Sequence, residues 1–89
     1  MDFEWDENKN KSNQEKHGID FNKAKKVFED NNRKASPDLR KDYGEDRWIT
    51  IGKILDIIII VVYTVRNTAY RIISARYAKK KERETYNNQ

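Results

Sequence analysis

Four arginines and one histidine are the residues of this chain best suited to chemistry on an anion. Arg47, Arg66, Arg71 and Arg76 lie in or beside predicted strands of the second half, and His17 is the only histidine. Guanidinium groups fixed on neighbouring strands can bind phosphate and stabilise a pentacovalent phosphorane without a metal. An imidazole titrates near neutral pH and can act as general base for a hydroxyl. These residue types indicate RNA as a candidate ligand and its cleavage as a candidate reaction.

Each of these side chains also has an ordinary structural explanation. His17 falls at the C-terminal end of a predicted helix, where a partial positive charge on the imidazole interacts favourably with the negative end of the helix dipole. Any single arginine could pair with the acidic N-terminal segment or with solvent. We expect Trp5 and Trp48 to pack in the core, and the lysine run 79–81 is typical of a solvated helix face. Further candidates for RNA binding are Lys16, Trp48, Tyr63, Lys79 and Lys80.

The predicted sheet is built around the apolar run Ile57–Tyr63, which has no polar face and is typical of a strand buried on both sides. A strand over about 46–52 precedes it and a strand over 69–74 follows it, with short turns at 52–55 and 65–68. Three strands with such short connections predict an antiparallel meander.

The N-terminal half predicts an edge strand over 1–5 and then two helices. Asp6 can cap a first helix that runs to about Lys16 and stops at Gly18; its polar composition is typical of a solvated surface helix. Asp20 can cap a second helix to about residue 30, with a core-facing stripe at Phe21, Ala24, Val27 and Phe28.

A short strand near 33–36, a mobile loop to about 45 and a C-terminal helix over 78–87 complete the chain. Ala78, Glu82 and Tyr86 lie one turn apart on that helix. The expected fold class is α+β, with the helices packed on one face of an antiparallel sheet of four to five strands.

Composition limits the alternatives. Eighty-nine residues form a single domain, 1–89, with a net charge of +4 and a pI near 9.3 that favour anionic partners. Residues 1–20 hold six acids and three lysines, so this end can pair with the basic C-terminal end. The absence of cysteine excludes disulfides, and a single histidine argues against a zinc site; we expect no metal and no cofactor. The chain lacks a signal-peptide pattern and its apolar run is too short to span a bilayer, so we expect a cytoplasmic protein and no membrane partner.

The motifs of the chain, taken in order, resemble the BrnT family. The first half contributes Phe3–Asp6, Lys9-Asn10, Asn13, Lys16–Phe21, Ala24 and Val27-Phe28. The second half contributes Arg47-Trp48, Thr50–Gly52, Val61–Thr64, Arg66, Arg71–Arg76, Ala78, Glu82-Arg83 and Tyr86. Only the loop of about residues 31–45 is unmatched. Lys79 stands where the family often has a threonine that could cap the last helix, which leaves the start of that helix open.

This resemblance implies a toxin of a type II toxin–antitoxin system with a RelE-like fold. The implied activity is metal-independent RNA cleavage that inhibits translation. The implied substrate is RNA, and one candidate form of it is ribosome-associated mRNA. The implied partner is a BrnA-like ribbon-helix-helix antitoxin, through which alone the toxin would meet operator DNA. His17, Arg47, Arg66, Arg71 and Arg76 occupy polar motif positions and are the implied catalytic residues. The alternative is a non-catalytic RNA-binding or co-repressor module of the same fold.

Overall fold

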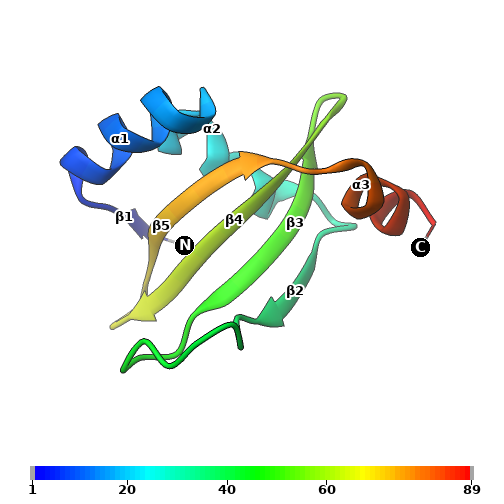
Figure 1. Cartoon of the computed structure of the whole chain (residues 1–89). Coiled ribbons are helices and arrows are strands. Elements are labelled where there is room, and N and C mark those ends of the chain that lie inside the picture. The colour runs from blue at the N-terminus through cyan, green and yellow to red at the C-terminus, as the bar shows by residue number, and fades with distance from the viewer. Residues whose placement is uncertain (1, 89) are drawn as a thin grey trace.

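The computed structural model describes residues 2–88, which form a five-stranded sheet with helices on both of its faces (Figure 1). The strands lie in the order β1-β5-β4-β3-β2. Their bounds are β1 Asp2–Glu4, β2 Lys34–Pro37, β3 Trp48–Ile54, β4 Ile57–Arg66 and β5 Ala69–Tyr77. The helices are α1 Glu7–His17, α2 Phe21–Ala24, the 3-10 helix η1 Lys25–Glu29 and α3 Lys80–Asn87. The predicted α+β class and order of elements are confirmed, and the predicted start at Met1 lies outside the described residues.

Strand β4 is the centre of the sheet and is buried on both sides, as its composition predicts. Ile59 and Val61 belong to the core beneath α2 and η1, whereas Ile58 and Ile60 belong to a second cluster on the opposite face. The pairs β3–β4 and β4–β5 are antiparallel, which confirms the meander. The turn from β3 to β4 is only two residues long and sets Leu55 at φ 54°.

The prediction of a wholly antiparallel sheet was wrong, because β1 pairs with β5 in parallel, with Phe3 opposite Tyr70. Side-chain alternation shows which residues share a face of a strand, but it carries no information about the direction of the neighbouring strand.

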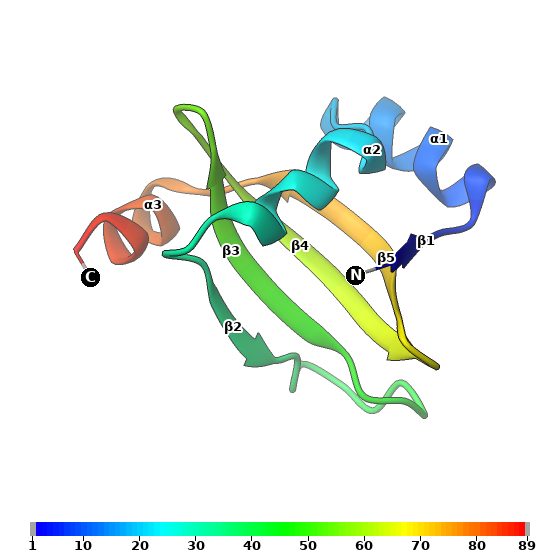
Figure 2. The same ribbon diagram turned by 180° about the vertical axis from the view of Figure 1, so that it is seen from behind.

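The prediction that the helices share one face of the sheet was also wrong. Helices α2 and η1 cross one face (Figure 2), whereas α3 packs on the other, where Tyr86 and Ala78 meet Ile58 and Ile60. Strand β5 runs to Tyr77, beyond the predicted end at residue 74, and so carries the chain to that face before α3 begins. The isoleucine side chains of this face are stabilised when they are shielded from water, and the Tyr86 ring covers part of them.

Further boundaries differ from the prediction: β3 covers Trp48–Ile54 and β4 continues to Arg66, into the predicted turns at 52–55 and 65–68, and two helices differ as well. The second helix is α-helical only to Ala24 and continues as η1, although Phe21, Ala24 and Val27 are fully buried as predicted. Here η1 passes close to β3, since a Cβ on Gly52 would lie 2.7 Å from Cγ1 of Val27. The last helix begins at Lys80, and the amide of Lys79 donates to Oε1 of Glu82 at 2.7 Å.

Helix α1 has the predicted caps but is not simply a solvated surface helix. Asn10 and Asn13 are buried in spite of their polarity. Asn13 Nδ2 donates to the carbonyls of Ile19 and Ala75 at 3.0 and 2.9 Å, and the Ala75 amide donates back to Asn13 Oδ1 at 3.1 Å. Asn10 Oδ1 accepts from the amide of Phe21 at 2.9 Å. Hydrogen bonds from Asn13, rather than an apolar stripe, therefore attach α1 to the sheet, and those of Asn10 attach it to the start of α2.

In the part of the chain from residue 2 to residue 88, no helix is both long enough and apolar enough to cross a membrane.

Candidate functional site

A cavity of about 400 Å³ opens where the end of α1, the second half of β5 and the start of α3 meet. Its walls come from six separate segments of the chain: α1, the β2–β3 loop, β3, β4, β5 and α3. The lining residues are Lys16, His17, Arg40, Ile49, Ile60, Val62, Ser74, Arg76 and Glu82. We call this cavity the basic pocket, because Lys16, Arg40 and Arg76 bring three cationic side chains to it.

The attachment of α1 explains how His17 reaches this pocket. Strand β1 pairs only with the first residues of β5, up to Arg71, so the outer edge of β5 is free beyond that point. The side-chain amide of Asn13 occupies this edge and pairs with both backbone groups of Ala75, as a neighbouring strand would. His17 follows one turn later, and Gly18, at φ 71°, ends the helix there. His17 and Arg76 thereby line one cavity although 58 residues separate them in the sequence.

Arg76 is held in the pocket by a carboxylate. Its Nη1 and Nη2 donate to the two Glu82 oxygens, each at 2.8 Å. These hydrogen bonds lower the pKa of Glu82 to about 2 and raise the pKa of Arg76. Arg76 Nη1 also donates to the Tyr77 carbonyl at 3.3 Å. The guanidinium is therefore preorganised, and its Nε–H and the second N–H of Nη2 remain for an anion.

The floor of the basic pocket is apolar. Ile49 from β3 and Ile60 and Val62 from β4 form it, and Ser74 contributes a hydroxyl at the side. An apolar surface bordered by cations suits a nucleotide, whose base is flat and largely apolar and whose phosphate is anionic.

The other three predicted arginines lie at the opposite end of the sheet. Arg71 pairs with Thr64 and Arg76 with Ile60, four residues along β4 or roughly 13 Å. The pairing with β4 puts Arg66, Arg71 and Arg76 on the same face, because a β-bulge in β5 between Ile72 and Ser74 offsets the odd spacing of Arg71 and Arg76. Arg71 Nη1 donates to Glu4 at 2.7 Å, which agrees with the predicted pairing of the acidic and basic ends. The predicted arginines therefore share a face without sharing a site.

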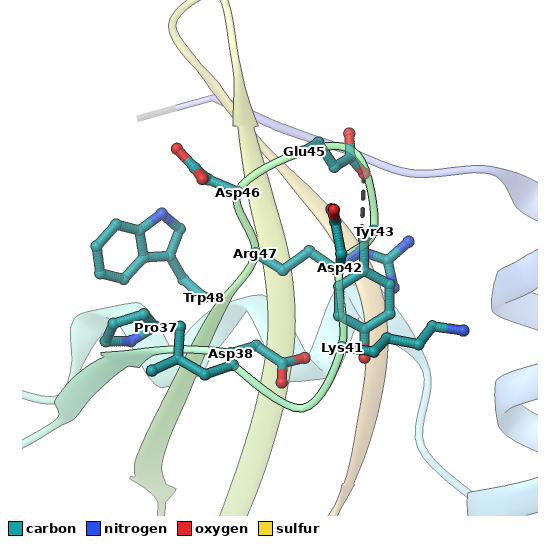
Figure 3. A pocket seen from close by; sticks show the side chains of 10 residues that line it. Pro37, Asp38, Lys41, Asp42, Tyr43, Glu45, Asp46, Arg47 and Trp48 are labelled. Atoms are coloured by element: carbon teal, nitrogen blue, oxygen red, sulfur yellow. Dashed lines mark ion pairs between the residues drawn. The ribbon is translucent and has the colours of Figure 1, made fainter.

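Arg47 and Arg66 share Glu45 as an ionic partner. Arg66 Nη2 lies 3.2 Å from Glu45 Oε2, and Arg47 Nε lies 3.7 Å from Oε1. The Arg47 guanidinium also stacks on the Tyr43 ring at 3.9 Å from its centre. Figure 3 shows Arg47, Tyr43 and Glu45 among the side chains that line a second cavity in the β2–β3 loop. This cavity has a volume of about 550 Å³ and His17 does not line it. Arg47 Nε is buried without a hydrogen bond in the described part of the molecule.

The aromatic and lysine candidates lie outside the basic pocket, except for Lys16. Tyr63 is buried in the core and its Oη accepts from Thr50 Oγ1 at 3.1 Å. The expectation of core packing holds for Trp5, which packs against Phe21, but not for Trp48, which is 37 % exposed and borders the second cavity. Lys79 and Lys80 are exposed at the start of α3.

Sequence reasoning missed Arg40, Ser74 and the pairing of Glu82. Ser74 and Arg76 are two residues apart on one strand and so share a face, which is a signal that the sequence does contain. Arg40 lies in a loop without a periodic pattern, and nothing in the sequence points to it.

Within residues 2–88, no group of three or more His, Asp or Glu side chains is arranged to hold a metal ion. The model of one known family, the ribonuclease toxin BrnT of type II toxin–antitoxin systems, matches residues 5–82. This range contains every residue that lines the basic pocket. No curated protein matches the chain.

Proposed function

Because the chain belongs to the BrnT family of ribonuclease toxins of type II toxin–antitoxin systems, we propose that its basic pocket is where RNA is cleaved. The observation that carries this proposal is the meeting of His17, Lys16 and Arg76 in one cavity with an apolar floor. Single-stranded RNA would lie on the face of the sheet that carries the basic pocket, with a base on the pocket floor and the scissile phosphate at Arg76.

The proposed reaction is attack by the ribose 2′-oxygen on the adjacent phosphorus. His17 accepts the 2′-hydroxyl proton, the new O2′–P bond forms and the P–O5′ bond breaks. The leaving 5′-oxygen takes a proton from water, which yields a 2′,3′-cyclic phosphate and a 5′-hydroxyl end. Arg76 stabilises the charge that develops on the phosphorane oxygens, and Lys16 adds positive potential beside it. In this scheme side chains supply the general base and the charge stabilisation, so we propose that cleavage is metal-independent.

The biological setting follows the family. Cleavage of mRNA would inhibit translation, and the expected neutralising partner is a BrnA-like ribbon-helix-helix antitoxin. The five-stranded sheet with two N-terminal helices supports a RelE-like assignment of the fold.

The test compares RNA cleavage in EDTA and growth arrest for the wild type, His17→Ala, Arg76→Ala and Arg76→Lys. We expect Arg76→Ala to lose about 10²-fold or more in rate, as removal of one transition-state donor does, and His17→Ala to lose about 10²-fold. Arg66→Ala is the matched control, because it removes an arginine of the same face outside the pocket, and should lose less than tenfold.

Full activity of a folded Arg76→Ala protein would overturn the proposal. A wild-type protein that binds RNA but neither cleaves it nor arrests growth would establish the alternative, a non-catalytic binding or co-repressor module.

A further inference from the structure

The β2–β3 loop contributes Arg40 to the basic pocket, on the opposite side from His17 and Lys16. Arg40 lines the same cavity as Arg76, with Ile49 and Ile60 in the floor between the loop and β5. The loop thus brings one more guanidinium to the proposed RNA site.

Arg40 is fixed by a buried carboxylate. Its Nε and Nη2 donate to Asp38 Oδ1 and Oδ2, both at 2.8 Å, and its amide donates to Oδ1 at 3.2 Å. The Asp38 side chain is fully buried, whereas 63 % of the Arg40 side chain is exposed. The Asp38 amide donates to the Arg47 carbonyl at 2.8 Å, which ties this pair to the start of β3. The hydrogen bonds from the Arg40 side chain and amide lower the pKa of Asp38 to about 2, so the pair stays ionic across physiological pH.

The two pocket guanidiniums have the same design. Each is held by a bidentate carboxylate, Arg76 by Glu82 and Arg40 by Asp38. Both guanidiniums line one cavity, so their like charges repel; the hydrogen bonds to Glu82 raise the pKa of Arg76, whereas the charge of Arg40 opposes this rise. An anion between them would relieve this repulsion, and an RNA strand supplies phosphates at regular spacing.

A purely structural role for Arg40 would be to neutralise Asp38. That role does not require the guanidinium to lie exposed in a cavity shared with Arg76. We propose that Arg40 forms a second phosphate subsite, which binds the phosphate next to the one at Arg76, with Asp38 as the positioning residue. This inference rests on the proposed function and deepens it by assigning a contact to the neighbouring nucleotide.

The test measures Kd for a 2′-O-methyl RNA oligonucleotide, which cannot be cleaved by the 2′-oxygen, as a function of salt. Each phosphate contact to a single strand contributes about 0.7 to the slope of log K against log salt. We expect Arg40→Ala to weaken binding about tenfold at low salt and to reduce the slope by about 0.7. Lys41→Ala is the matched control, because Lys41 is a cation of the same loop placed over the Tyr43 ring, and its slope should equal that of the wild type.

Two further variants separate binding from folding. Arg40→Ala leaves Asp38 as an unpaired buried charge, so the double variant Asp38→Asn/Arg40→Ala removes both charges and should show the same loss of slope. Asp38→Asn alone should raise KM several-fold with a smaller effect on kcat, since it frees Arg40 without removing it. If the Asp38–Arg40 pair were merely structural, these substitutions would lower the thermal stability and leave KM and the salt slope unchanged.

The outcomes distinguish this inference from the proposed function. If the wild type binds and cleaves RNA but both folded Arg40 variants keep the wild-type slope, only the Arg40 subsite is overturned. If the wild type binds the 2′-O-methyl RNA with the expected Arg40 dependence but does not cleave RNA, the subsite stands and cleavage fails. If the wild type does not bind RNA, both are overturned.

Discussion

The Tyr63 ring lies on the face of β4 that η1 covers, perpendicular to the Phe28 ring with 5.0 Å between their centres. Its neighbour Val62 lies on the opposite face and lines the basic pocket. One step along a strand therefore separates a core residue from a pocket residue, because successive side chains point to opposite faces. Residue type alone made Tyr63 a candidate for stacking on RNA bases, and its position removes it from our proposed site.

Tyr63→Phe tests this assignment. We expect the variant to lose about 1 kcal/mol of stability, because Thr50 loses a buried hydrogen-bond partner, and to cleave RNA at the wild-type rate. Urea unfolding and a cleavage assay measure the two effects. Tyr77→Phe, at a tyrosine that is 46 % exposed, should change neither. A tenfold loss of cleavage in a stable Tyr63→Phe protein would contradict this assignment and indicate that Tyr63 contacts the RNA.

Helix α1 shows how one element places a functional group without an apolar face. Its buried asparagines replace the hydrophobic stripe that usually attaches a helix to its neighbours, with Asn13 bonded to β5 and Asn10 to the start of α2. Asn13 in particular completes the edge of β5 where β1 ends, and the position of His17 depends on that junction.

Asn13→Ala tests the junction between α1 and β5. Removal of the amide leaves the buried N–H and C=O of Ala75 without these partners, so we expect a loss of about 2–4 kcal/mol in urea unfolding. Cleavage measured where the variant is still folded should also fall, because His17 is no longer held beside Arg76. Ser12→Ala, at an exposed position of the same helix, should stay within about 0.5 kcal/mol of the wild type. Equal stability of the two variants would contradict this account.

For the molecule as a whole, ion pairs add contacts between and within segments that backbone pairing and apolar packing already bring together. Glu4–Arg71 joins the first strand to the last, Asp38–Arg40 orders the β2–β3 loop and Glu82–Arg76 ties α3 to β5. The pKa values of Asp38 and Glu82 are both lowered to about 2, from ordinary values near 4. A carboxyl whose pKa is lower in the folded state stabilises the fold above its unfolded-state pKa, and this contribution is lost as the pH falls through the folded-state value.

The molecule should therefore lose stability between about pH 4.5 and pH 2. In Glu82→Gln we expect lower stability at pH 6 and a smaller further loss over that acidic range, because the variant has no carboxyl to protonate at this position. Urea midpoints at pH 6, 4 and 2.5 measure the difference. Glu84→Gln, two residues along α3 and exposed, should follow the wild-type curve. Parallel curves for Glu82→Gln and the wild type would show that the pair contributes no pH dependence.

Local sequence patterns were enough to predict the order and type of the elements, because caps, apolar periodicity and turn residues act over a few neighbouring positions. The Asp6 and Asp20 caps, the stop at Gly18 and the central strand β4 all agree with their patterns. The motifs also identified the family, which the family match over residues 5–82 confirms.

Which side chains share a cavity depended on the three-dimensional packing of the chain. The direction of β1, the face on which α3 packs and the course of the β2–β3 loop depend on contacts between residues far apart in the chain, which leave no local periodicity. Those contacts bring Arg76 beside His17, separate it from Arg47, Arg66 and Arg71, and add Arg40. Residue types were enough to indicate phosphate chemistry, whereas the composition of the site depended on long-range packing.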